Sequence, residues 1–189
     1  MDIQKLILNY NPYSEQEVID KEYYLNFISS FEDVLTRQNI LGHFTASAFV
    51  VNKDFTKTLL VYHNILDGYI YPGGHADGES DLLSVAIREV EEETGLKAIA
   101  LNTAPFAINS APTLTHIKRG KVVPAHIHFD VVYLLQCDDS VTTQIKEDEN
   151  QDVRWVELEE LENIKLVNFM YPIFKKLVHK LKNTNPFIK

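Results

Sequence analysis

The spacing of apolar and polar positions predicts a helical N-terminal part. Residues 1–40 carry two patterns with a helical period, one over residues 2–9 and one from Ser14 to about residue 34. Ser14 has the position of an N-cap, with Glu17 three residues further on, as in a capping box. We therefore expect residues 1–40 to form a helical extension packed on a core that residues 41–189 supply.

The pattern changes to that of strands after Gly42. Residues 44–51 and 58–62 are apolar and rich in β-branched side chains. The polar residues 52–54 between these two runs suit a turn. The simplest interpretation is a hairpin of two antiparallel strands.

A glycine-containing break separates this hairpin from an acidic helix. Residues 72–74, Pro-Gly-Gly, interrupt the strand pattern. Ser80 or Asp81 is expected to open a helix that runs to about residue 94. Gly95 then has the position of the glycine that commonly follows the last turn of a helix.

The remaining apolar runs predict further strands and a C-terminal helix. Two long runs and one short run indicate strands, a basic stretch indicates a turn or loop, and the last run has the period of an amphipathic helix. The two long strand runs are residues 98–108 and 125–135, and the short one is residues 153–156. The expected turn or loop is residues 118–121, and the expected helix is residues 168–181.

Length and composition are those of one globular domain. The chain has 189 residues, of which 45% are hydrophobic, and this is enough for a full core. The single Cys137 excludes an intrachain disulfide and a zinc site made only of cysteines. No stretch approaches the roughly 18 apolar residues of a membrane span, and the first residues lack the pattern of a signal peptide. We expect a cytoplasmic protein that does not contact membranes.

The net charge of −9 argues against broad binding of nucleic acid or of anionic membranes, because both depend on clustered Lys and Arg. Much of this charge lies in one segment. Between Gly73 and Gly95, seven acidic residues stand against one base, Arg88, which gives −6. The acidic segment is mostly the predicted helix 80–94.

Three glutamates fall together on one side of that helix. Glu89, Glu92 and Glu93 share this side, apart from the apolar stripe. Like charges at such spacing cost a few tenths of a kcal/mol per pair, so a bound cation would explain the cluster. Hard oxygen ligands favour Mg²⁺ or Mn²⁺. The alternative is an ordinary solvated acidic face.

The segment around these glutamates resembles the signature box of the Nudix hydrolases. That box has a glycine, five residues, a glutamate, seven residues, then Arg-Glu, an aliphatic residue, any residue, Glu-Glu, any residue, a glycine and an aliphatic residue. The positions in register are Gly74, Arg88, Glu89, Val90, Glu92, Glu93, Gly95 and Leu96. One position departs: Ser80 stands where the box has its first glutamate, and its neighbours Glu79 and Asp81 are candidates to replace it.

The resemblance covers roughly residues 42–180 and implies a fold and an activity. The fold is an α/β class Nudix-type α/β/α sandwich with a mixed sheet, to which the helical extension is added. The activity is metal-dependent hydrolysis of a diphosphate bond in a nucleoside diphosphate linked to another moiety, or in a related organic pyrophosphate. The partner is then a small-molecule diphosphate, with Mg²⁺ or Mn²⁺ as cofactor. The extension could cover the sheet, shape the substrate pocket or form a homodimer contact.

The resemblance also assigns roles within the box. Glu92 and Glu93 are implied to be the principal metal ligands, with the Gly73 carbonyl as a further ligand. Glu89 is implied to be a ligand or the base that acts on the attacking water. Arg88 is implied to orient a box glutamate through an ion pair; an ordinary surface arginine is the alternative.

Three candidates lie outside the box. Glu149 precedes the predicted strand 153–156, where many Nudix enzymes supply another carboxylate ligand or base, and a solvated acidic loop is the alternative. Tyr71 could stack on a base, and Arg119 could pair with a phosphate. Core packing for the tyrosine and plain solvation for the arginine are the alternatives.

A histidine pair alternates along the strand 125–135. His126, His128 and Asp130 would face one side of the sheet, where they could line the pocket or reach a phosphate. A His-x-His zinc site is the alternative, although the sequence alone indicates no clear further ligands.

Two other functions compete with hydrolysis. Isopentenyl-diphosphate isomerase shares the fold but depends on a cysteine in an early strand, whereas Cys137 lies near the end of a later one. A non-catalytic Nudix-fold protein could bind or sense a nucleotide-like ligand, and Ser80 in the box would be consistent with that use. The acidic charge opposes a nucleic-acid-binding regulator.

Overall fold

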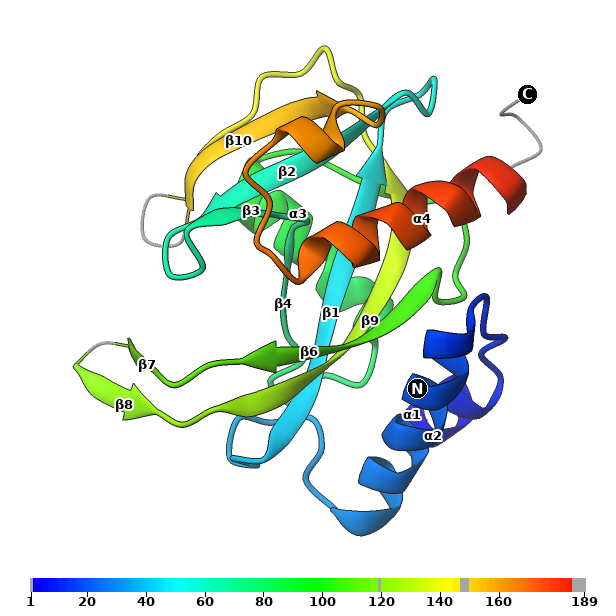
Figure 1. The fold of residues 1–189 in the computed structure, drawn as a ribbon, viewed down its shortest axis with the longest axis vertical. Helices are drawn as coiled ribbons and strands as arrows, with labels where there is room; N and C mark the ends of the chain where they lie inside the picture. Colours follow the sequence, from blue (N-terminus) through cyan, green and yellow to red (C-terminus); the bar gives the residue numbers. More distant parts are fainter. Residues whose placement is uncertain (1, 119, 147–149, 185–189) are drawn as a thin grey trace.

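A mixed sheet of eight strands forms the centre of the structure, a computed structural model that describes residues 2–118, 120–146 and 150–184 (Figure 1). The strands of its main path, in spatial order, are β10 (Asn150–Glu157), β2 (Lys57–His63), β1 (Gly42–Val51), β9 (His126–Gln136) and β5 (Ile99–Ala100). Three further strands pair beside this path: β3 (Gly68–Ile70) with β2, β4 (Gly73–His75) with β1, and β6 (Ala107–Thr113) with β9. The pair β1–β9 is parallel, and the other pairs in this sheet are antiparallel.

Helices cover both faces of the sheet. Helix α3 (Leu82–Thr94) lies behind it and α4 (Met170–Thr184) crosses in front, while α1 (Ile3–Leu8) and α2 (Glu15–Ser30) lie together at one side (Figure 1). A short helical turn, η1 (Leu161–Asn163), precedes α4. The α/β/α arrangement expected from the sequence is therefore confirmed.

The alternation of side chains along β1 divides the core into two parts. Phe44, Ala46, Ala48 and Val50 belong to a cluster that includes the buried sides of α1, α2 and α3. Phe49 and Val51 belong to a second cluster, which includes the buried side of α4. All ten residues of β1 are buried because the strand has neighbours on both edges and helices over both faces.

Several boundaries differ from those that the apolar pattern predicts. The hairpin is confirmed, since Val51 of β1 pairs with Thr58 of β2. The run 98–108 is not one strand: it divides into β5 and the start of β6. Residues 72–74 do not end the sheet, because Gly73 and Gly74 pair with β1 as part of β4. Lys118 and Lys121, expected in a turn or loop, are strand residues: β7 (His116–Lys118) pairs with β8 (Lys121–Val123), and the two strands project from the body (Figure 1).

The second N-terminal helix begins as predicted and ends earlier. Ser14 is the N-cap of α2 and accepts a hydrogen bond from the Glu17 backbone N–H at 3.3 Å. The helix ends at Ser30 rather than near residue 34. The Glu17 side chain turns into the protein, where its carboxylate accepts hydrogen bonds from the Tyr10 hydroxyl at 2.7 Å and the Tyr13 backbone N–H at 2.8 Å. It therefore joins α2 to the loop that follows α1.

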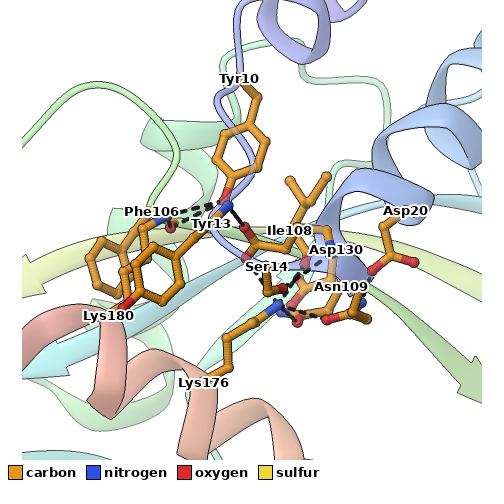
Figure 2. A network of polar contacts seen from close by, with 12 residues as sticks. Tyr10, Tyr13, Ser14, Asp20, Phe106, Ile108, Asn109, Asp130, Lys176 and Lys180 are labelled. Carbon is orange, nitrogen blue, oxygen red and sulfur yellow. Dashed lines mark hydrogen bonds and ion pairs between the residues drawn. The ribbon is translucent and has the colours of Figure 1, made fainter. Parts of the chain in front are cut away.

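A polar network connects this N-terminal part to α4 and β6 (Figure 2). The Lys176 ammonium lies 3.0 Å from a Glu17 carboxylate oxygen and donates to the Asn109 side-chain oxygen at 2.7 Å and the Ile108 carbonyl at 3.0 Å. Lys180, one turn further along α4, donates to the Tyr10 hydroxyl at 3.2 Å. Charged groups far apart in the sequence are thus paired with each other inside the protein.

Membrane-spanning helices were not expected. Within the part of the chain that the structure describes, every helix is too short or too polar to cross a bilayer.

Candidate active site

Helix α3 is closed at both ends by its own sequence. Asp81 is the N-cap, and its carboxylate accepts hydrogen bonds from the Ser84 backbone N–H at 3.3 Å and the Ser84 hydroxyl at 2.8 Å. Gly95 follows the last turn with a φ of 71°, a conformation that glycine adopts readily, and its N–H donates to the Glu91 carbonyl. The buried side of α3 packs on β1 and β9, and the acidic residues are held at fixed places beside the sheet.

Two glycines allow strand β4 to approach α3 closely. The Gly73 N–H donates to a carboxylate oxygen of Glu93 at 3.1 Å. A Cβ added to Gly74 would overlap the carboxylate of Glu89, and one added to Gly73 would overlap Ser47 of β1. Glycine at these two positions is therefore a packing requirement. It brings the β4 backbone against the carboxylates of Glu89 and Glu93.

The three box glutamates differ in their surroundings. Glu93 is 4% exposed, while the side chain of Glu89 is 14% exposed and that of Glu92 is 46% exposed. The expectation that all three lie on one side, apart from the packed face, is wrong for Glu93. Its bond to Gly73 compensates part of the cost of burying it.

Two basic side chains lie beside the glutamates. Arg88 Nε lies 3.5 Å from one oxygen of Glu92, and Arg88 Nη2 lies 3.8 Å from an oxygen of Glu89. Lys146 Nζ lies 3.4 Å from the other oxygen of Glu92. Lys146 was not identified from the sequence, because it approaches α3 from a loop more than 50 residues away.

The donor set suits a hard divalent cation. Glu89, Glu92 and Glu93 offer carboxylate oxygens, and Gly73, whose N–H donates to Glu93, has a backbone carbonyl as a further oxygen. Magnesium and manganese prefer oxygen ligands of this kind. The space that the missing Gly74 side chain leaves is occupied by the Glu89 carboxylate, so this carboxylate lies directly against β4. The residues present fit Mg²⁺ or Mn²⁺.

Ser80 lies in the loop before α3, between two acids with local structural roles. Asp81 caps α3, and the exposed Glu79 accepts a hydrogen bond from the Asp81 N–H at 3.0 Å. Both carboxylates therefore make hydrogen bonds that hold the start of the helix.

Tyr71 lies in the core rather than in an open groove. It is buried, and its ring meets Phe174 of α4 edge-on with centroids 5.6 Å apart. Its hydroxyl donates to Asp130 at 2.7 Å, and Asp130 also accepts from the Ser47 hydroxyl at 2.7 Å. Burial raises the pKa of Asp130 despite these hydrogen bonds. This is the packed position that was the alternative to stacking.

The histidine pair of β9 belongs to a larger group. Nε2 of His126 lies 3.0 Å from Nε2 of His128, and the rings of His43 and His75 lie beside them. Burial lowers the pKa of His128 to about 2, and it also lowers the pKa of His43. His43 was not identified from the sequence, because only the parallel pairing of β1 with β9 places it opposite His128. Two other candidates, Arg119 and Glu149, lie outside the described residues.

Comparison with known proteins finds one matching family model and several similar solved structures. A family model described as the NUDIX domain matches residues 42–177. No curated protein matches the chain. Among solved structures, a NUDIX-family hydrolase from Clostridium perfringens is 24% identical and covers 71% of this chain and 95% of its own, with a TM-score of 0.55.

Two other solved structures show the same fold. The MutT protein from Methanosarcina mazei Go1 is 17% identical and covers 76% of this chain and 97% of its own, with a TM-score of 0.56. An ADP-ribose pyrophosphatase from Streptococcus suis is 19% identical and covers 75% of this chain and 91% of its own, with a TM-score of 0.52. At these identities the likeness is one of fold.

Proposed function

Because the chain belongs to the Nudix family, whose domain spans residues 42–177, we propose that it is a metal-dependent hydrolase of small-molecule diphosphates. The bond cleaved is a diphosphate bond in a nucleoside diphosphate linked to another moiety, or in a related organic pyrophosphate. The observation that carries this proposal is the contact of β4 with α3, in which Gly73 and Gly74 meet the carboxylates of Glu93 and Glu89.

The oxygen donors near this contact have different roles in the proposal. Glu92, Glu93 and the Gly73 carbonyl would hold Mg²⁺ or Mn²⁺. When bound, the cation supplies positive charge that offsets repulsion between the acidic site and the phosphate oxygens. Glu89 accepts the proton of the attacking water on its carboxylate, a role that suits a carboxylate held in place by packing.

The two cations have an orienting role in this proposal. Arg88 lies within ion-pair distance of both Glu89 and Glu92, and so it fixes how these carboxylates point. Lys146 adds a second positive group beside Glu92. Arg88 and Lys146 offset repulsion among the glutamates before the metal binds.

The test is hydrolysis of a panel of diphosphates with Mg²⁺ or Mn²⁺. Relatives of the same fold include proteins named as an ADP-ribose pyrophosphatase and an Ap4A hydrolase, so the panel begins with ADP-ribose and dinucleoside polyphosphates. Nucleoside triphosphates, sugar nucleotides and coenzyme A complete it. Release of phosphate-containing products is measured for the wild type, for Glu92→Gln and for Glu91→Gln.

Glu92→Gln removes one charge from a half-exposed side chain and leaves the core intact. We expect metal-dependent turnover to fall about a hundredfold or more, the range for a lost ligand or base. Glu91→Gln makes the same chemical change at the neighbouring exposed position and should retain wild-type activity. Ligand binding without turnover in the wild type would instead assign the chain to non-catalytic binding or sensing.

A further inference from the structure

Four histidines from three adjacent strands converge at one place. His43 is in β1, His75 is in β4, and His126 and His128 are in β9. The pairing explains the convergence, because His43 lies opposite His128 and His75 lies opposite Thr45, two residues along β1. One ring nitrogen from each of His43, His75 and His128 lies within 4.8 Å of the others.

Backbone carbonyls orient two of the rings. His43 Nδ1 lies 3.3 Å from the Asn39 carbonyl, and His126 Nδ1 lies 2.8 Å from the Pro124 carbonyl. A carbonyl can only accept a hydrogen bond, so each Nδ1 carries the proton and each Nε2 carries a lone pair. Metal-binding histidines are commonly held in this way, with the second ring nitrogen donating to a carbonyl.

The lone pairs point into the cluster. His43 Nε2 is buried, and among the described residues it has no hydrogen-bond partner. A buried acceptor without a partner is unfavourable unless something else satisfies it. His126 Nε2 lies 3.0 Å from His128 Nε2, so this nitrogen also faces the other rings. A cation among the rings would satisfy the lone pair of His43 Nε2, and it would take the place of the hydrogen bond between His126 and His128.

We propose that His43, His75, His126 and His128 form a second metal site, which binds Zn²⁺. Imidazole nitrogen suits zinc, whereas Mg²⁺ prefers oxygen, so this site and the carboxylates of α3 select different ions. A tetrahedral zinc ion holds its nitrogen ligands roughly 3.3 Å apart, which requires small side-chain rotations from the separations present. The bound ion joins β1, β4 and β9 beside the glycines that contact α3.

Cobalt binding tests this site without any measurement of hydrolysis. The full chain is treated with a chelator, dialysed and titrated with CoCl₂, because four-coordinate Co²⁺ absorbs visible light much more strongly than six-coordinate Co²⁺. Zinc is then added in competition, and the zinc content is measured by elemental analysis. The variants are His43→Gln and His126→Gln, and the second replaces a half-buried ring that tolerates substitution more readily. Melting temperatures with and without Zn²⁺ verify that each variant folds.

Two controls separate this site from the rest of the molecule. His179→Gln removes an exposed histidine on α4, and Glu92→Gln removes a carboxylate from α3. Neither should alter the strong four-coordinate absorption of cobalt, which comes from the histidines.

We expect one Zn²⁺ per chain, a four-coordinate cobalt spectrum and a zinc-dependent rise in melting temperature for the wild type and both controls. In His43→Gln and His126→Gln, affinity should fall by more than about tenfold, since even the loss of an outer-shell partner has that effect. A wild type without the four-coordinate spectrum would overturn the proposal. So would an unchanged spectrum in both folded histidine variants.

Discussion

Glu92 and Glu93 are adjacent in sequence, yet the protein uses them differently. Glu93 is 4% exposed and accepts a hydrogen bond from Gly73, so it contributes to the packing of β4 as well as to the proposed metal site. Glu92 is 46% exposed and lies between Arg88 and Lys146. A substitution at Glu93 would therefore disturb structure and chemistry together, while one at Glu92 tests the chemistry.

Gly74→Ala tests whether the close approach of β4 matters. The added methyl group would overlap the Glu89 carboxylate, which has to move away from its position beside the strand. We expect kcat/KM to fall by about tenfold or more, because small displacements of catalytic groups are costly. Overpacking should lower the free energy of unfolding by about 1 to 3 kcal/mol. Steady-state kinetics and urea unfolding measure the two effects, and unchanged kinetics would show that Glu89 need not lie there.

At the scale of single elements, the start of α3 bears on whether a neighbouring acid replaces the box glutamate for which Ser80 stands. Asp81 has the capping role, and Glu79 holds the backbone of Asp81. If the cap is the whole function of Asp81, its charge is not needed for hydrolysis. Asparagine caps helices about as well as aspartate, which gives a matched pair of substitutions.

We predict that Asp81→Ala lowers the free energy of unfolding by about 1 kcal/mol, because the Ser84 N–H loses its acceptor. Asp81→Asn should keep both stability and kcat/KM near the wild-type values. Urea unfolding and the diphosphate assay check these outcomes. A folded Asp81→Asn protein with activity reduced tenfold or more would mean that Asp81 replaces the missing box glutamate.

Local sequence patterns predicted the elements that depend on local signals. The period of α3, its cap and Gly95 are all within one segment, and the hairpin β1–β2 needs only a short turn. The prediction of one strand over residues 98–108 was wrong because it passed over a break signal within the run, a polar pair followed by a proline. Both β5 and β6 pair with β9, at different positions along it, and Asn102, Thr103 and Pro105 lie in the gap between them.

In the candidate site, too, residues close together in the sequence were predictable and residues from distant segments were not. The box glutamates and glycines lie within one segment, so the resemblance of that segment to the Nudix box was enough to propose them. His43 and Lys146 come from distant parts of the chain. His43 reaches the cluster through the pairing of β1 with β9, and residue periodicity contains no information about which strands pair.

At the scale of the whole molecule, a buried ion pair joins α2 in the N-terminal part to α4 in the C-terminal part. Glu17 of α2 is 0% exposed, and the side chain of Lys176 of α4 is 10% exposed. Burial alone would raise the pKa of Glu17, but Lys176 and the hydrogen bonds from Tyr10 and Tyr13 outweigh it and lower the pKa. We propose on this basis that residues 1–40 are a fixed part of the fold and not a separable appendage.

Glu17→Gln should lower the free energy of unfolding by about 3 to 5 kcal/mol near neutral pH, because Lys176 would remain buried without its counter-charge. Urea unfolding measures this. Glu15→Gln, in the exposed first turn of the same helix, is the control and should cost less than about 1 kcal/mol. A Glu17→Gln protein as stable as the control would show that the pair contributes nothing.

The stability difference between the wild type and Glu17→Gln should depend on pH in a defined way. A carboxyl group with a lowered pKa stabilises the folded state above its ordinary pKa of 4.5, and this contribution disappears as the pH falls through the lowered value. The difference in unfolding free energy between wild type and Glu17→Gln should therefore be constant between about pH 5.5 and neutral pH and shrink below pH 4.5.

The parallel pairing of β1 with β9 also has a consequence for how the chain folds. It matches ten residues of β1 with partners 85 positions later, from Gly42 with Ile127 to Val51 with Gln136. Closing so long a loop is entropically costly and slows folding. Both β4 and α3 lie inside that loop. During synthesis, the acidic helix must therefore wait for residues near 136 to leave the ribosome before it can pack on the full β1–β9 pair.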